Sequence, residues 1–242
     1  DVERSRGLGD VYKRQTQEFE FHQGPVFSDI VLVDEINRAP AKTQAALFEV
    51  MEERQVSMDG VTYPMGDLYT ILATQNPVEQ EGTYRLPEAQ LDRFLMKVTM
   101  GYPSADDELE ILKRHEQHAD LVKLSDVKPV LTKDEVLQLR SYMNDVVIDE
   151  SLLRYITQIV QQTRSSRAVY LGASPRASVA MLQASKAYAL LQGRDFVTPE
   201  DIKAVTPSIL QHRLVLTAEA EMEGYTAYKV AMKLIDKVEV PK

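Results

Sequence analysis

Two adjacent carboxylates, Asp34 and Glu35, directly follow a short apolar run and are the side chains of this chain best suited to chemistry. The run, Ile30–Val33, is rich in β-branched residues and too short for a helix, which predicts a strand buried on both faces of a parallel sheet. Open α/β sheets bind ligands at the carboxyl ends of their strands. One carboxylate there can hold Mg²⁺ through water, and a second can orient or deprotonate an attacking water. The pair also suits the N-terminal end of a helix dipole, and the pair alone leaves both interpretations open.

Three further polar side chains fall at the ends of predicted elements. Asn76 follows a predicted second strand over Leu68–Thr74, and Arg93 immediately precedes a predicted third strand over Phe94–Met100. Arg176 opens a predicted helix. A carboxylate pair, a neutral amide and two guanidiniums are the parts that a phosphoryl-transfer site needs besides its phosphate cradle.

Each of these three residues also has a purely structural interpretation. Asn76 precedes Pro77 and is an ordinary turn residue. Arg93 beside Asp92 can form a surface ion pair of little energetic value. Arg176 lies in a first helical turn, where the dipole opposes a positive charge, so this position favours a functional reason for the arginine.

Composition excludes several classes of protein. The 242 residues are 44% hydrophobic and 27% charged, as in an ordinary globular protein. A net charge of −9 argues against a general nucleic-acid binder. The chain has no cysteine, so disulfides and thiolate metal sites are excluded. No apolar stretch is long enough for a bilayer and the first residues do not form a signal peptide, which predicts a cytoplasmic protein without membrane insertion.

The first part of the chain alternates strand and helix patterns. Residues 1–15 show no apolar period and are predicted to be an unrelated tail or a junction of foreign sequence. Residues 19–27 suggest a hairpin or an extended insert. A helix is predicted over Pro40–Glu53, followed by a hairpin over residues 55–63 that turns at Asp59-Gly60.

From about residue 104 the strand patterns stop and the pattern is helical. A capping box opens the first helix of this region, which is expected to bury Val136, Leu139 and Met143. The predicted helix starts are Thr132, Asp149, Ser174 and Thr198, with a further helix over residues 227–236. The order of elements therefore predicts an α/β domain followed by a helical bundle.

Four strings resemble the MoxR family of AAA+ ATPases. Three of them are Asp34–Pro40 (Asp-Glu-Ile-Asn-Arg-Ala-Pro), Ala73–Tyr84 and Leu86–Phe94. The fourth, Gly172–Arg176, resembles that family's second sensor motif. The likeness covers residues 19–242, and strings of this length are far more specific than a single short motif.

The resemblance implies the fold class and the domains. Residues 16–103 would form a partial AAA+ parallel-sheet core, which holds the Walker B, sensor 1 and arginine-finger residues. A linker and connecting helix would span 104–128, and an all-helical lid with sensor 2 would span 129–242.

The resemblance also implies a role for each site residue. Asp34 would bind Mg²⁺ through water, and Glu35 would activate the water that hydrolyses ATP. Asn76 would be sensor 1, whose amide positions that water or the γ-phosphate. Arg93 would be the arginine finger that reaches into the neighbouring subunit's site, and Arg176 would be the sensor 2 residue that contacts the γ-phosphate from the lid.

At the level of the whole protein, the family implies a homo-oligomeric ring, expected to be a hexamer. Such a ring would couple Mg-ATP hydrolysis to chaperone-like remodelling or maturation of partners, commonly proteins with von Willebrand A-type domains. A catalytically inactive AAA+ adaptor is the alternative. Arg38 could serve the subunit interface or pair with Glu35, and Arg85 replaces the family's usual proline; the sequence leaves both roles open, together with the client protein.

The family's Walker A loop, Gly-x-x-x-x-Gly-Lys-Thr/Ser, does not occur in these 242 residues. Gly7 and Gly9 are not followed by Lys-Thr or Lys-Ser, and Lys13 is no substitute. We therefore expect a fragment with a junction near Gln15, whose Asp34 and Glu35 pair is idle without the missing loop.

Overall fold

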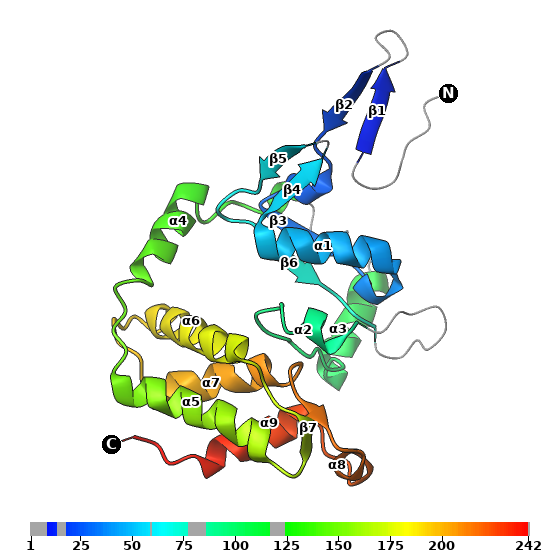
Figure 1. Ribbon diagram of the computed structural model, residues 1–242. Coiled ribbons are helices and arrows are strands. Elements are labelled where there is room, and N and C mark those ends of the chain that lie inside the picture. Colours follow the sequence, from blue (N-terminus) through cyan, green and yellow to red (C-terminus); the bar gives the residue numbers. More distant parts are fainter. Residues whose placement is uncertain (1–8, 14–17, 59, 77–85, 117–123, 242) are drawn as a thin grey trace. The chain divides into compact units, whose positions relative to one another are not determined.

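The computed structural model describes residues 9–13, 18–58, 60–76, 86–116 and 124–241 (Figure 1). Backbone contacts divide the chain into two compact units, residues 1–93 and residues 94–242. The first unit holds the strands and the acidic pair, and the second is mostly helical.

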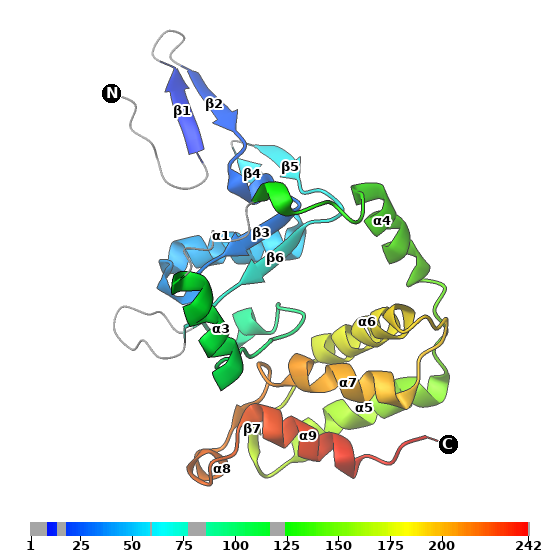
Figure 2. The same cartoon turned by 180° about the vertical axis from the view of Figure 1, so that it is seen from behind.

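The described residues of the first unit form paired strands and one long helix. Its elements are β1 Gly9–Lys13, β2 Glu18–His22, the 3₁₀ turn η1 Pro25–Phe27, β3 Ile30–Val33, the 3₁₀ turn η2 Ile36–Arg38, α1 Ala41–Glu53, β4 Gln55–Met58, β5 Val61–Pro64, β6 Thr70–Ala73 and α2 Glu88–Leu91. Strands β3 and β6 pair in parallel and lie side by side in both ribbon views (Figures 1 and 2). Strands β4 and β5 form an antiparallel hairpin, as do β1 and β2.

Helix α1 covers one face of the β3–β6 sheet. Val31 and Ile71 are paired neighbours and pack on that face in a cluster with Val50 of α1. Because side chains alternate along a strand, Leu32 and Leu72 point to the opposite face, where they are 65% and 54% exposed. The prediction that β3 is buried on both faces is therefore wrong: in the described part of the chain, only the α1 side supplies apolar partners.

Most predicted elements of the first unit are confirmed. Strands β3 and β6, helix α1 and the β4–β5 hairpin all lie within a few residues of their predicted positions. Gly60 of the hairpin has φ +78°, a conformation that glycine adopts at little cost, while Asp59 lies outside the described residues. Strand β1 falls within residues 1–15, where the sequence shows no apolar period. Backbone pairing with β2 does not require such a period, because it uses N–H and C=O groups alone.

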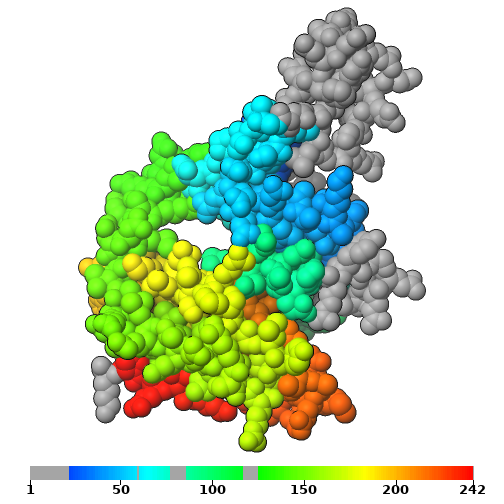
Figure 3. Space-filling view, viewed as in Figure 1, coloured from blue at the N-terminus to red at the C-terminus, as the bar shows by residue number. Residues whose placement is uncertain are grey.

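The second unit is built around a large helical core, beside which a smaller cluster is formed by Leu216, Ala220, Val230 and Leu234. Its elements are α3 Ala105–Glu116, η3 Leu124–Asp126, α4 Lys133–Tyr142, α5 Glu150–Ser165, β7 Val169–Leu171, α6 Pro175–Leu191, α7 Pro199–Leu210, β8 Val215–Leu216, α8 Ala218–Met222 and α9 Ala227–Lys237. Its largest fully buried apolar side chains are Tyr155, Ile159, Met181, Ile202, Ile209 and Leu210. Figure 3 shows α5 and α6, in yellow-green and yellow, packed together on one face of this unit.

The predicted helix starts of the second unit are confirmed. Thr132 and Glu135 form the capping box of α4, Asp149 caps α5, and Ser174 caps α6 ahead of a proline. The expectation that α4 buries one face is wrong, because none of its residues is buried and Leu139 is exposed. Capping is a local effect and can start a helix that has no core contact.

The predicted third strand over Phe94–Met100 is wrong. This segment is irregular, and its backbone groups bond to the end of α7 rather than to a neighbouring strand. The Lys97 amide donates to the carbonyl of Ser208 at 2.8 Å, and the Arg213 guanidinium donates to the carbonyl of Phe94 at 2.6 Å. Conversely, β7 and β8 form a short antiparallel sheet in a region where the sequence predicts only helices.

Among the helices in the described ranges, none combines the length and the apolar character that a membrane crossing requires.

Candidate active site

The carboxyl ends of β3 and β6 bring the acidic pair together with a threonine. Val33 lies opposite Ala73 in the parallel register, so the residues that follow them, Asp34 and Thr74, are neighbours. The Thr74 hydroxyl donates to Asp34 Oδ1 at 2.5 Å and accepts from the Glu35 backbone N–H at 2.8 Å. One hydroxyl therefore orients the first carboxylate and fixes the backbone of the second.

Glu35 occupies an unusual backbone conformation at this edge of the sheet. Its φ and ψ are 50° and 51°, in the left-handed region that few residues other than glycine adopt. Such strain persists only where surrounding contacts hold it, and it clusters at functional sites. The contacts here are the Thr74 hydroxyl and the Ile36 amide, which donates to the carbonyl of Thr74 at 3.1 Å.

Gln44 supports the same turn from α1. Its side chain is buried, and its Nε2 donates to the carbonyl of Ile36 at 3.1 Å. The turn that carries Glu35 is thus held from β6 on one side and from α1 on the other.

Arg38 pairs with Glu35 across the 3₁₀ turn. Its Nε lies 3.2 Å from Glu35 Oε2, and both side chains are partly exposed. Of the two roles that the sequence left open for Arg38, the structure shows the pairing with Glu35. An exposed pair of this kind is weak, so Glu35 can exchange it for another partner.

The donor set at the strand ends fits Mg²⁺ bound through water. Asp34 is exposed at the end of β3, and Asn76 lies partly buried two residues beyond Thr74. Within the described ranges, no group of three or more His, Cys, Asp or Glu side chains gathers to enclose a metal. Mg²⁺ usually keeps several waters and takes only one or two protein carboxylates together with substrate phosphates, so a single exposed Asp34 is a suitable ligand.

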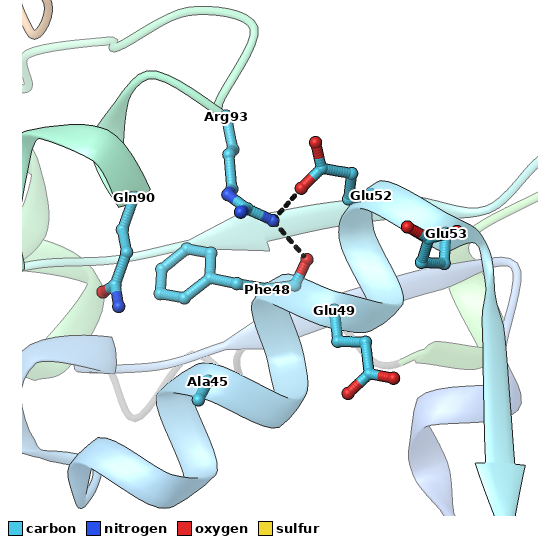
Figure 4. Close-up of a pocket in the computed structure, with 7 residues that line it drawn as sticks. All are labelled: Ala45, Phe48, Glu49, Glu52, Glu53, Gln90 and Arg93. Atoms are coloured by element: carbon cyan, nitrogen blue, oxygen red, sulfur yellow. Dashed lines mark hydrogen bonds and ion pairs between the residues drawn. The ribbon is translucent and has the colours of Figure 1, made fainter.

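Arg93 lies in an acidic hollow beside α1, shown in Figure 4. Its Nη1 forms an ion pair with Glu52 and also donates to the carbonyl of Phe48 at 3.3 Å. Glu49 and Glu53 also line the hollow, and in Figure 4 Glu49 points away from the guanidinium. The ion pair that the structure shows for Arg93 is the one with Glu52, on helix α1.

Arg176 belongs to the second unit, where it lies exposed in the first turn of α6. The Ser174 hydroxyl caps this helix by accepting from the Arg176 N–H at 3.1 Å. The structure therefore brings Asp34 and Glu35 together within one hydrogen-bonded group, while Arg93 and Arg176 each lie in a separate local environment. Arg85 lies outside the described residues.

Sequence reasoning missed two residues of this site. Thr74 is 40 positions from Asp34, and the parallel register of their strands is the signal that could have linked them. Glu52 is an exposed-face glutamate of α1 with no sequence signal that connects it to Arg93, which lies 41 positions away.

Comparison with known proteins decides the family. Residues 7–96 match the model of the ATPase family associated with various cellular activities (AAA), and residues 161–233 match the AAA lid domain. The uncharacterized protein YeaC of Bacillus subtilis is 47% identical over 231 residues, which are 96% of this chain and 71% of YeaC. Chaperone MoxR1 of Mycobacterium tuberculosis is 40% identical over 241 residues, 96% of this chain and 63% of MoxR1. The chain belongs to the MoxR family of AAA+ ATPases.

A solved structure agrees with this assignment. The crystal structure of a candidate ATPase from Cytophaga hutchinsonii superimposes with a TM-score of 0.86 at 41% identity, over 97% of this chain and 73% of that one. The predicted fold class, an α/β AAA+ core with a parallel sheet and a helical lid, is confirmed. The chain spans between about three fifths and three quarters of the length of these three relatives.

Proposed function

We propose that this MoxR-family chain supplies the hydrolytic side of an ATPase site. Asp34 would serve Mg²⁺ and Glu35 would serve the attacking water. The observation that supports this proposal is the group at the ends of β3 and β6, where the Thr74 hydroxyl ties the Asp34 carboxylate to the Glu35 backbone. Preorganised groups of this kind are what phosphoryl transfer requires of the protein, since its catalysis is mostly positioning and electrostatics.

Glu35 would act as the base or orienting group for water. Its ion pair with Arg38 uses Oε2, so Oε1 is the oxygen that would accept a hydrogen bond from the attacking water. Mg²⁺, when bound with ATP near Asp34, would offset the negative charge of the phosphates. Asn76, at the end of the neighbouring strand, would hold the water or the γ-phosphate without adding charge.

The two arginines would complete the site from different places. Arg93 would act as an arginine finger in the site of the neighbouring subunit, which requires a ring; the proposed ring is a hexamer. Arg176 would contact the γ-phosphate from the lid. A planar guanidinium suits both roles, because it is always charged and offers several donors to phosphate oxygens.

The proposed work of the ring is chaperone-like remodelling or maturation of partner proteins. This proposal is supported by the relative MoxR1, which is named a chaperone. Proteins with von Willebrand A-type domains are the proposed partners.

The 242 residues contain no Gly-x-x-x-x-Gly-Lys-Thr/Ser sequence. Backbone N–H groups and the lysine of such a loop hold the phosphates of ATP. We therefore propose that this chain does not bind ATP tightly by itself. Tests of turnover would use the 242-residue chain, preceded by the phosphate-loop segment of a MoxR relative. This protein is called the loop-restored protein below.

The decisive test is Glu35→Gln in the loop-restored protein. Glutamine keeps the size and the hydrogen-bonding oxygen but cannot accept the proton, so turnover should fall by about 100-fold or more while ATP affinity stays the same. Steady-state hydrolysis and calorimetry with Mg-ATP would measure the two quantities. Undiminished hydrolysis would show that Glu35 is not the catalytic group.

The second candidate function is an inactive adaptor that binds other AAA+ subunits or partners without nucleotide. One sequence observation favours it, namely that the 242 residues contain no phosphate loop. Calorimetry of the loop-restored protein separates the two functions, because an adaptor would bind no Mg-ATP even with the loop present. Micromolar binding by the 242 residues alone would contradict our proposal that these residues need the loop.

A further inference from the structure

In the loop that leads into helix α6, the backbone N–H and the backbone carbonyl of Ala173 are both hydrogen-bonded to side chains of α5. The Ala173 N–H donates to the Thr163 hydroxyl at 3.0 Å, and the Ala173 carbonyl accepts from Arg164 Nε at 3.0 Å. Thr163 and Arg164 are consecutive residues in the last turn of α5. The end of α5 therefore fixes the loop from two adjacent positions.

Thr163 is suited to this task because it is completely buried. Its hydroxyl donates to the carbonyl of Val160 at 2.6 Å, which directs a lone pair of the oxygen to Ala173. Helical threonines commonly bond to a carbonyl of the preceding turn, but here the same oxygen also reaches a separate segment. Removing this hydroxyl would leave a buried N–H without its acceptor, and such groups are strongly disfavoured.

Gly172 lets the loop come this close. A Cβ at this position would lie 2.9 Å from the backbone N and Cα of Arg164, a distance that real Cβ atoms essentially never show. The loop and the end of α5 are thus in contact at the level of their backbones, and the contact cannot shift without moving one of the two elements.

This contact lies three residues before Arg176. Ser174 follows Ala173 and caps α6 through the Arg176 N–H, and the next residue, Ala177, is completely buried in the core. The backbone of Arg176 is therefore held on both sides. Before it, Thr163 and Arg164 bind Ala173, and after it, Ala177 packs in the core. The side chain of Arg176 itself is exposed and projects from this fixed base.

We propose that Thr163 is a positioning residue for Arg176, through its bond to the loop at Ala173. This inference rests on the proposed function, in which Arg176 contacts the γ-phosphate of ATP. A guanidinium that starts from a fixed backbone loses less freedom when it binds phosphate.

The test is Thr163→Val in the loop-restored protein, with separate affinities for Mg-ATP and Mg-ADP. Valine has the shape of threonine but no hydroxyl. ADP lacks the γ-phosphate, so its affinity should not change. The affinity for ATP divided by the affinity for ADP, called the ATP-to-ADP ratio below, should fall by about 10-fold. A purely structural role would weaken both nucleotides alike, and that result would overturn the inference.

Thr157→Val is the matched control. Thr157 lies in the same helix, and its hydroxyl donates to the carbonyl of Leu153 at 2.9 Å. Thr157 is exposed, and this hydrogen bond stays within α5 instead of reaching the loop. This control should keep the ATP-to-ADP ratio of the unmodified protein. A fall as large as that of Thr163→Val would refute a specific role for Thr163.

Arg176→Ala separates this inference from the proposed function. If it leaves the ATP-to-ADP ratio unchanged, the proposed role of Arg176 fails. If it lowers the ratio and Thr163→Val does not, Arg176 keeps its role and the inference about Thr163 is overturned. The double variant should be no worse than Arg176→Ala alone, because Thr163 acts through Arg176.

Arg164→Met keeps the inference testable if Thr163→Val does not fold. Arg164 is exposed, so its loss should leave the core intact, yet it removes the donor to the Ala173 carbonyl. The ATP-to-ADP ratio should fall in the same direction by a smaller factor, and an unchanged ratio would overturn the inference. In the 242-residue chain, hydrogen exchange of the Ala173 amide should quicken by about 10-fold or more in Thr163→Val, and an unchanged rate would show that the bond does not hold the loop.

Discussion

The two units of the chain differ in how their apolar side chains are covered. In the second unit, α5, α6, α7 and α9 surround one continuous core in which several large side chains are completely buried. In the first unit, a small cluster beneath α1 covers one face of β3 and β6, and Leu32 and Leu72 stay exposed on the other. The predicted hydrolytic residues thus lie on the less covered unit, and the predicted sensor 2 residue lies on the well-packed one.

This difference implies that the two parts of the predicted site are held in different ways. Arg176 is positioned by a buried hydroxyl and a rigid core. Asp34 and Glu35 depend on one threonine hydroxyl, a strained turn and a buried glutamine. Regions with few buried apolar contacts open most easily, so the first unit should respond more to added contacts than the second.

The largest effect should come from Ile159→Ala in the second unit. Ile159, on α5, is completely buried in the core of the second unit. The variant should lose about 2–5 kcal/mol of unfolding free energy because a cavity remains. Denaturant unfolding monitored by helical circular dichroism measures this loss. Leu153→Ala in the same helix, at a site that is 38% exposed, is the control and should cost less than about 1 kcal/mol. Equal losses would contradict the description of Ile159 as part of a buried core.

The next largest effect should come from Asp201, which caps α7 and is almost fully buried. Its carboxylate should make the unfolding free energy depend on pH. Burial raises the pKa of this carboxyl, but hydrogen bonds from Arg194 and Thr198 outweigh it, and the net pKa lies below its ordinary value. The Arg194 guanidinium binds it in a fork, with N to O distances of 2.7 and 2.5 Å. Asp201→Asn should therefore cost about 2 kcal/mol at neutral pH.

The sign of the Asp201 effect follows from its lowered pKa. The stabilisation is complete above the unfolded-state pKa of about 3.9 and is lost as the pH falls through the lower folded-state value. The difference in unfolding free energy between the original chain and Asp201→Asn should thus be constant from pH 7 to about 5 and shrink below about 4. A difference that stays constant down to pH 2 would show that the carboxylate charge is not the cause.

A smaller effect should follow from Thr132→Ala at the start of α4. The variant removes a capping box worth about 1 kcal/mol, but α4 has no buried residue, so only this helix should open. Amide exchange within α4 should accelerate while the global unfolding midpoint stays the same. Thr226→Ala is the contrast, because Thr226 caps α9, which contributes to the core, and its loss should move the global midpoint.

The sequence predicted best those features whose partners lie close together in the chain. The capping box of Thr132 with Glu135, and the Ser174-Pro175 start of α6, each involve residues within four positions. Such signals do not depend on the rest of the fold. The acidic pair at a strand end was predicted in the same way, from the short apolar run before it.

Long-range contacts decided what the sequence could not predict. The bonds of Thr74 to Asp34 and of Glu52 to Arg93 span 40 and 41 positions, and no local pattern encodes them. Phe94–Met100 has the apolar pattern of a strand, but a strand also needs a partner for its backbone groups. Its backbone instead bonds to the end of α7. A local sequence pattern contains no information about such a distant partner.

The smallest change in stability should come from Leu32→Lys on the open face of β3. Because Leu32 is 65% exposed, the substitution should alter the unfolding free energy by no more than about 0.5 kcal/mol. It should nevertheless reduce the fluorescence of a dye that binds apolar surface, since it interrupts the patch shared with Leu72. Val31→Lys is the matched control one residue earlier: it places the same charge against α1 and should destabilise strongly.

The two neighbouring variants together can break the comparison between the units. If Leu32→Lys destabilises the chain as much as Val31→Lys, the second face of β3 is covered in solution and the first unit has a two-sided core after all. If Leu32→Lys leaves the unfolding free energy unchanged and dye fluorescence falls, the face of β3 that carries Leu32 is exposed in solution. The acidic pair then lies at the end of a strand supported on one side, and Thr74 and Gln44 become the contacts whose loss should disturb Glu35 most.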